Sequence, residues 1–204
     1  MYAIVRMILA SLLGGLAIII LEKFTALRKR VVYTVAISIS MLFCIALVFW
    51  PFENLFVTFD SPDAAYEYFN PGNSNIVLTI EGDACDFVID RKDNSDSILM
   101  IPKNQNGWKV GIGSNTKRIT HQASNGIIIS VYQYKNTNDY FITILDTEGG
   151  ESIISDDYDT VFYPLEEKNE FLGEIFVTYY AHVSNFDSQY SVVVNGSKIV
   201  FQNQ

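Results

Sequence analysis

Two long apolar runs open the sequence, and a region of alternating apolar and polar positions follows them. Residues 3–21 and residues 31–50 are each long enough, as helices, to cross a membrane core about 30 Å thick. The second run has no charged residue, and the first is interrupted only by Arg6, near its beginning. A long arginine side chain near a helix end can extend to the lipid headgroups. The pattern therefore predicts two transmembrane helices within residues 1–50.

The loop between the two runs, residues 22–30, holds four basic residues and one acidic residue. Short basic loops stay in the cytoplasm, so we expect the tip of the hairpin inside and both the N-terminus and residues 51–204 outside. A cleaved signal peptide is the alternative for the first run. No small-residue cleavage site follows it, and a second apolar run begins after nine residues, which favours an uncleaved, multi-pass protein of the cell membrane.

From residue 51 onwards the pattern indicates strands and turns. Ser61 is a suitable N-cap and Pro62 suits the first helical position, so one short helix is expected before the strands. Apolar positions then recur with a period of two, and Asn195-Gly196 is typical of a type I′ turn. The predicted strands are 75–81, 85–90, 97–101, 107–110, 126–134, 140–146, 152–155, 160–163, 174–183, 189–194 and 198–201.

The strands are expected to pair as antiparallel meanders. Runs 126–134 and 140–146 are predicted to form one hairpin, and runs 174–183 and 189–194 another. The predicted fold class is thus a two-helix transmembrane hairpin followed by a mainly antiparallel β (α+β) soluble domain, residues 51–204, with one short N-terminal helix.

Charge and cysteine content also divide the chain between residues 50 and 51. Residues 1–50 hold five basic residues and one acidic residue, a net charge of +4, whereas residues 51–204 hold nine basic and 22 acidic residues, a net charge of −13. Such a domain repels nucleic acid and suits a cationic partner or bound cations, although solubility alone also explains the charge. Cys44 and Cys85 lie on opposite sides of the division, so we expect no disulfide in the domain, which favours a bacterial origin.

Small residues recur at helical spacing in both apolar runs. They are Ser11 and Gly15 in the first, and Ala36, Ser40 and Cys44 in the second. Such residues let two helices approach closely. Packing within the hairpin is the favoured interpretation, and a homo-oligomer formed through the same faces stays open.

No recognisable motif in the sequence predicts catalysis, a cofactor or a metal site. His121 and His182, the two histidines, lack a second ligand at zinc-site spacing. Asp156, Asp157 and Asp159 cluster in one loop without calcium-loop spacing, so a solvated loop is favoured over a cation site, which stays open. We therefore expect a protein that is not an enzyme. A histidine clustered with carboxylates in a cleft would instead favour a membrane-tethered enzyme acting on cell-wall or peptide substrates.

Aromatic side chains supply the candidate binding site. Phe176, Tyr180 and His182 share one face of the run 174–183, and Tyr132 and Tyr134 form a comparable pair on the run 126–134. Exposed aromatic patches are typical of surfaces that bind proteins, peptides or sugars. The alternative is that another layer covers these rings and that they serve as packing.

Several short segments carry a family resemblance. The order SPDAAYEYFNPG, a strand pair, NGWKVG and DYFITILD resembles a pattern in small membrane-anchored bacterial proteins of unknown function. The residues that carry it are Ser61, Pro62, Ala64, Ala65, Gly107, Trp108 and Lys109. The resemblance implies membrane anchoring. The expected function is therefore that of a double-pass membrane protein whose acidic outer domain binds an envelope or extracellular partner, in an accessory or immunity-type role.

Overall fold

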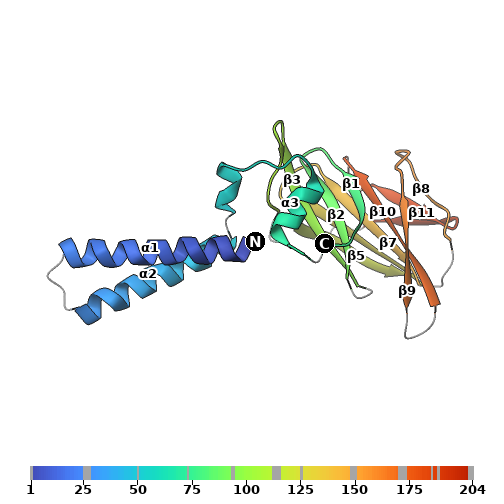
Figure 1. Cartoon of the computed structure of the whole chain (residues 1–204). Helices are drawn as coiled ribbons and strands as arrows, with labels where there is room; N and C mark the ends of the chain where they lie inside the picture. Colours follow the sequence, from blue (N-terminus) through green and yellow to red (C-terminus); the bar gives the residue numbers. More distant parts are fainter. Residues whose placement is uncertain are drawn as a thin grey trace.

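A computed structural model of the chain describes residues 2–24, 29–49, 51–72, 74–92, 95–111, 116–124, 126–147, 151–169, 174–184, 186–187 and 189–201. Two long helices, α1 (Tyr2–Phe24) and α2 (Lys29–Phe49), form an antiparallel hairpin at one end, and a β domain forms the other (Figure 1). Both helices are long and apolar enough to cross a membrane, over Ile4–Lys23 and Lys29–Ala46. Because α1 begins beside the β domain, the start of the chain and the domain lie at the same end of the hairpin.

The two helices approach each other along small residues. Ala10 of α1 and Ala36 of α2 are buried, and a Cβ atom added at Gly14 would lie 2.5 Å from the Oγ of Ser40. A Cβ atom at Gly15 would meet nothing within 4 Å, and Cys44 is exposed. Part of the small-residue pattern therefore packs within the hairpin, and part lines an open groove. A homo-oligomer through that groove stays a prediction.

Alanine substitutions at the two neighbouring glycines should separate these roles. Either substitution improves helix propensity, but the methyl group at position 14 has to displace the Ser40 hydroxyl, which donates to the Ala36 carbonyl at 2.9 Å. We expect the Gly14→Ala hairpin to be less stable than the Gly15→Ala hairpin by about 1 kcal/mol, measured by unfolding in mixed micelles. Equal stabilities would show that the helices do not pack at Gly14.

The β domain holds three antiparallel sheets among the described residues. The four-stranded sheet has the order β1 (Ile76–Glu81), β2 (Cys85–Lys92), β3 (Ser95–Asn104) and β4 (Gly107–Trp108). The five-stranded sheet has the order β5 (Thr116–Ser124), β6 (Ile127–Tyr134), β7 (Tyr140–Asp146), β10 (Glu174–Val183) and β9 (Tyr163–Asn169). The three-stranded sheet has the order β12 (Ser197–Val200), β11 (Ser191–Val194) and β8 (Ile154–Asp156).

The five-stranded sheet is the central layer of this domain. One face packs on the three-stranded sheet, where Ile144 and Val192 belong to the same buried cluster. The opposite face packs on the four-stranded sheet, where the Phe87 and Phe141 rings stack with centroids 4.7 Å apart. The helix α3 (Pro62–Phe69) covers the outer face of the four-stranded sheet through Tyr66. The central strands are therefore buried on both faces.

Several local predictions are confirmed. The helix α3 starts where predicted, because the Ser61 Oγ accepts a hydrogen bond from the Ala64 amide at 3.1 Å and Pro62 follows the cap. The turn between β11 and β12 has φ of 50° at Asn195 and 82° at Gly196, as a type I′ turn requires. The two apolar helices and the mainly antiparallel domain are also as predicted.

The predicted hairpin of runs 174–183 and 189–194 is wrong. Strand β10 pairs with β7 and β9, whereas β11 pairs with β12 and β8. The two runs instead face each other across the layers, with Val177 of β10 and Val192 of β11 in one core cluster. The strand predicted at 160–163 begins only at Tyr163, and the edge strand β5 was not predicted, because its sequence, TKRITHQAS, is mostly polar.

A short 3-10 helix, η1 (Phe52–Leu55), joins the hairpin to the domain. Its Glu53 pairs with Arg6 of α1, with Nε–Oε1 and Nη2–Oε2 distances of 3.4 and 3.3 Å, and both side chains are buried. This pair was not predicted from the sequence, and it gives the Arg6 charge a partner and fixes η1 beside the first turns of α1.

Candidate functional site

Of the two interpretations of the aromatic face, an open binding surface or rings covered by another layer, the burial of these residues favours the second. Tyr134 and Tyr180 are only 5% and 3% exposed, and Tyr132, Phe176 and His182 are half-buried. The four-stranded sheet covers the tyrosines of this set: Tyr134 packs in the same buried cluster as Phe87, and the Phe87 ring lies 6.3 Å from the Tyr132 ring and 6.4 Å from the Tyr180 ring, between centroids. The alternation in the run 174–183 therefore assigned its side chains to the correct faces, but the face that carries Tyr180 is covered by a sheet as well. Binding at these five residues stays a prediction, and none of the five side chains is exposed.

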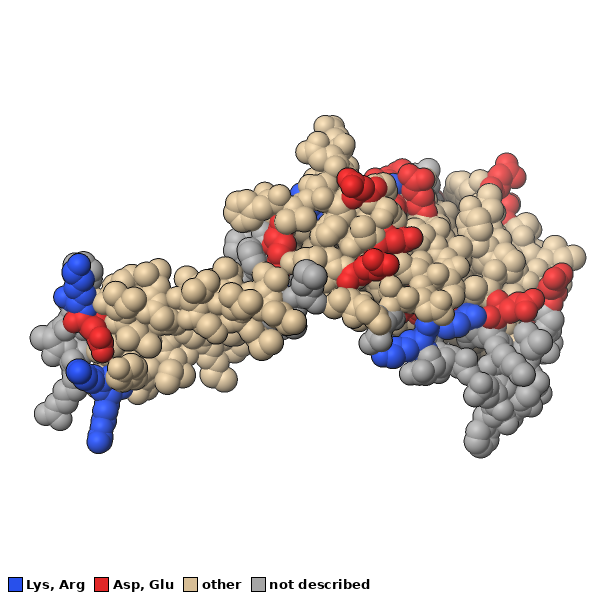
Figure 2. Space-filling view, in the orientation of Figure 1, with Lys and Arg blue, Asp and Glu red and all other residues tan. Residues whose placement is uncertain are grey.

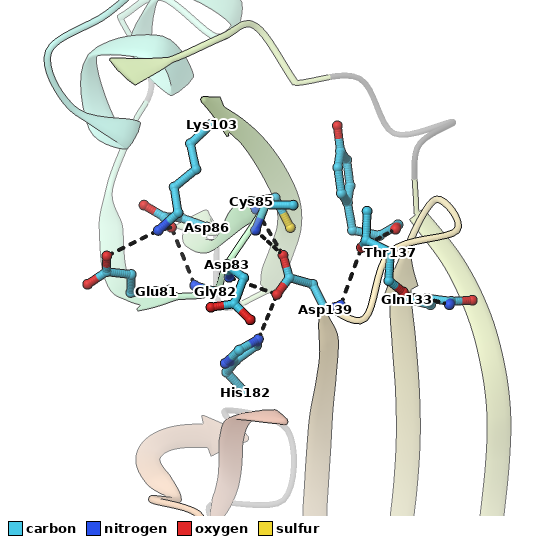
Figure 3. Close-up of polar contacts among 12 residues, drawn as sticks. Glu81, Gly82, Asp83, Cys85, Asp86, Lys103, Gln133, Thr137, Asp139 and His182 are labelled. Carbon is cyan, nitrogen blue, oxygen red and sulfur yellow. Dashed lines mark hydrogen bonds and ion pairs between the residues drawn. The ribbon is translucent and has the colours of Figure 1, made fainter. Parts of the chain in front are cut away.

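The structure instead gathers His182, Asp139 and Asp83, which lie far apart in the sequence (Figure 3). Asp139 directly precedes β7, Asp83 lies in the turn between β1 and β2, and His182 is near the end of β10. Pairing of β10 with β7 sets His182 opposite Phe141, and so next to Asp139. One potential ligand atom from each side chain lies within 4.8 Å of the others.

The Asp139 carboxylate is the centre of this cluster. Its Oδ1 accepts a hydrogen bond from the Asp83 amide at 2.7 Å and lies 2.8 Å from the Nε2 of His182. Its Oδ2 accepts hydrogen bonds from the amides of Ala84 at 2.5 Å and Cys85 at 3.0 Å. Three successive amides of the β1–β2 turn therefore bind one fully buried side chain of the central sheet. This contact fastens the four-stranded sheet to the five-stranded sheet.

Gly82 allows the β1–β2 turn to come this close. A Cβ atom there would lie 2.5 Å from the Cys85 carbonyl oxygen and 2.9 Å from the Phe141 ring. On the far side of the turn, Lys103 Nζ lies 3.0 Å from Asp86 Oδ1 and 3.1 Å from Glu81 Oε1 (Figure 3). The turn is thus held from both sides by charged groups.

Ionisation of the cluster follows from these contacts. Burial alone would raise the pKa of Asp139, but the hydrogen bonds from His182 and from the Asp83 and Ala84 amides outweigh it and lower the pKa to about 2. Burial raises the pKa of the Cys85 thiol, and the negative charges of Asp139 and Asp86 raise it further. Asp139 is therefore a carboxylate at neutral pH, and Cys85 is a thiol.

Cys85 should consequently resist alkylation in the folded protein. Its side chain is fully buried and its raised pKa disfavours the reactive thiolate. With Cys44→Ala removing the exposed thiol, we expect no maleimide incorporation at pH 8 in mild detergent and one label per chain after denaturation. Rapid labelling of the folded variant would contradict the placement of Cys85 in the core.

The cluster has the residue types of a metal site, but its contacts are those of a structural anchor. Each Asp139 oxygen already has two hydrogen-bond partners, and the Nε2 of His182 points at that carboxylate (Figure 3). A cation would have to displace the His182 bond. Nucleophilic chemistry at Cys85 is equally disfavoured, because the thiolate is the reactive form.

A small polar pocket of about 240 Å³ lies next to His182. It is lined by Tyr158, Thr160, His182, Val183 and Ser184. Ligand pockets usually have volumes of about 300–1,000 Å³, so this one suits only a small group. A histidine paired with a carboxylate beside a cleft is nevertheless the arrangement that would favour an enzyme.

The other candidates lie elsewhere. His121 is exposed on the edge strand β5, three strands from β10, and its Nδ1 is 2.8 Å from Ser130 Oγ. In the acidic loop, the Asp156 carboxylate accepts hydrogen bonds from the amides of Tyr158 and Thr160, both at 3.0 Å, and from two hydroxyl groups. Asp157 and Asp159 are exposed. These contacts account for the loop as a turn closed by Asp156, and cation binding there stays untested.

Outside the two helices, one group of exposed apolar side chains lies in what we term the distal segment, residues 151–163, on both sides of β8. Ile153 is 80% exposed and Val161 61%, and Tyr158 and Tyr163 are also exposed. Three acidic residues of the segment, Glu151, Asp157 and Asp159, are exposed as well. Strand β8 lies at the end of the domain away from the helices (Figure 1).

A scan of family models, a search of curated proteins and a search of solved structures found no match to this chain. The resemblance to membrane-anchored bacterial proteins therefore stays a prediction. Besides Ser61 and Pro62, which begin α3, two more of its residues have clear structural roles here. The Trp108 Nε1 donates to Asp86 Oδ2 at 2.6 Å, and the Lys109 Nζ donates to the Val57 carbonyl at 2.9 Å.

Proposed function

We propose that this chain is a double-pass membrane protein, with residues 22–30 in the cytoplasm and the β domain outside. Two helices of sufficient length and hydropathy support the two crossings. On the face shown in Figure 2, charged side chains gather at the tip of the hairpin and on the β domain, and the helices between them show none. Basic residues predominate near the tip, which favours a cytoplasmic loop.

The outer domain, in this proposal, binds an envelope or extracellular protein in an accessory or immunity-type role. The distal segment is the observation that carries the binding role. It exposes two aliphatic and two aromatic side chains at the end farthest from the hairpin, where a partner has free access. Its exposed acidic residues suit a partner surface that combines apolar anchors with basic side chains.

Photo-cross-linking in native membranes tests this role. A benzophenone amino acid at Tyr158 should give a discrete adduct, and the same group at Lys117, exposed on the β5 edge, should not. The adduct should disappear when Val161→Asp is added, because a charge would then occupy the apolar contact. No adduct at position 158, or the same adduct from both positions, would contradict the proposal.

A membrane-tethered hydrolase is the second candidate, favoured by the His182–Asp139 pair beside the polar pocket. In that reading His182 acts as a base, and Ser184, which lines the same pocket, supplies the nucleophile. The purified protein should then cleave cell-wall or peptide substrates. Ser184→Ala should abolish cleavage, because it removes the nucleophile. It should leave stability unchanged, because Ser184 is exposed. Unaltered cleavage in that variant would retire this candidate.

A further inference from the structure

Three apolar side chains next to the hairpin lack cover in the folded chain. Leu55 is the last residue of η1, Phe56 and Val57 follow it directly, and the three are 65%, 82% and 39% exposed. Large apolar side chains this exposed are costly in water when they are adjacent and held in place. Their position beside the helices, rather than at the far end of the domain, sets them apart from the distal segment.

The backbone that presents these side chains is fixed to the β domain. The Asn54 side chain makes two hydrogen bonds with the Val110 backbone, at 3.1 and 2.7 Å. The Lys109 Nζ donates to the Val57 carbonyl at 2.9 Å and to the Thr58 Oγ1 at 2.7 Å. A backbone bridge between Phe59 and Trp108 closes the segment. The three exposed side chains therefore project from a braced loop.

The same loop is held at the level of the helix ends. Glu53 of η1 contacts Arg6, which lies in the second turn of α1, and α2 ends at Phe49, only six residues before Leu55. In Figure 1 the teal turn of η1 lies beside the domain-proximal ends of both helices. If the helices span the membrane, Leu55 to Val57 lie where headgroups meet acyl chains.

We propose that Leu55, Phe56 and Val57 insert into the outer leaflet at the boundary between headgroups and acyl chains, and so hold the β domain at a fixed orientation on the membrane. The proposal rests on the membrane insertion of the proposed function. Aromatic and aliphatic side chains favour this boundary, where they leave water. The domain carries a net charge of −13 and would be repelled by anionic lipid. The proposed contact is therefore apolar and does not depend on anionic headgroups.

Fluorescence quenching by lipid-borne spin labels tests the insertion in the full-length protein. The protein is reconstituted into phosphatidylcholine vesicles that contain 5-doxyl phosphatidylcholine, and single cysteines carry an environment-sensitive dye. In a Cys44→Ala background, Phe56→Cys is compared with Ile153→Cys, a matched control that is 80% exposed but lies beside β8, away from the helices. A third protein is labelled at its native Cys44, within the span Lys29–Ala46. Cys85 is buried and stays unlabelled.

Insertion predicts strong quenching at Cys44 and at position 56, with at least a threefold greater effect at 56 than at 153. Leu55→Cys, as a second probe, should behave as position 56 does. Quenching at Cys44 with positions 55 and 56 no more quenched than 153 would overturn the inference and leave the proposed anchoring intact. Lack of quenching at Cys44 would overturn both, because the helices would then not be inserted.

Discussion

Replacing Asp139 by asparagine should destabilise the folded chain by about 3 kcal/mol or more. The carboxylate accepts hydrogen bonds from three successive amides and pairs with His182, and its side chain is fully buried. An asparagine side chain has one acceptor oxygen, so its amide group would face a buried donor. Urea unfolding of the full chain in mild detergent measures the loss. Asp159→Asn removes the same charge from an exposed turn and should change stability by less than about 0.5 kcal/mol.

The effect of Asp139 should also depend on pH in a defined direction. Because folding lowers its pKa from the usual 3.8 to about 2, its contribution is complete above about pH 4 and is lost as the pH falls towards 2. The stability difference between the native protein and Asp139→Asn should therefore shrink by roughly 2 kcal/mol between pH 5 and pH 2. A difference that stays constant over this range would show that Asp139 is not ionised in the fold.

Replacing Tyr180 by serine should cost about 3 kcal/mol or more, the scale for removing a buried aromatic side chain. Its ring packs near Phe87 between the two larger sheets, and its hydroxyl lies 3.2 Å from Asp96 Oδ2. The control is Tyr163→Ser, directly opposite Tyr180 in the β9–β10 register but 43% exposed, which should cost far less. The same unfolding experiment compares them.

A small loss of stability for Tyr180→Ser, similar to that of the control, would show that this tyrosine is exposed and not buried. The aromatic face predicted from the sequence would then be available for binding. A large loss, as expected here, leaves Tyr180 as a packing residue and directs the search for a partner to the distal segment.

The helices and turns were predictable because their signals are local. Ser61 and Pro62 specify the start of α3 within a few residues, and Asn195-Gly196 specifies a turn by its positive φ values. The two apolar runs are likewise long enough to be recognised by composition alone. Each of these features is decided by neighbours in sequence.

The layering of the domain was not predictable in the same way. Alternation in the run 174–183 assigns Val177 and Tyr180 to opposite faces but does not say that a sheet covers each face. Strand β7, one partner of β10, lies 30 or more residues earlier in the chain. Strand β5 is mostly polar, so it has no alternation of apolar residues that would identify it. The run 174–183 was wrongly paired with the run 189–194 because that is the next apolar run along the chain.

The Asp139 cluster was missed for a related reason. Its members come from a β1–β2 turn, a β6–β7 turn and the end of β10, and nothing in their local sequence differs from an ordinary turn or strand end. Gly82 is the nearest to a signal, since it marks close backbone approach, but it does not name the side chain that approaches. The Arg6–Glu53 pair has a weaker signal still, in one charge at each end of the hairpin region.

Cysteine accessibility in intact cells tests the proposed topology most directly. In a Cys44→Ala background, Ile153→Cys in the distal segment and Thr25→Cys in the basic loop are exposed to a membrane-impermeant maleimide, with Cys85 buried in both. The account predicts labelling of position 153 in cells whose outer face is accessible, and labelling of position 25 only after the membrane is disrupted. Labelling of position 25 in intact cells, with position 153 protected until disruption, would contradict it.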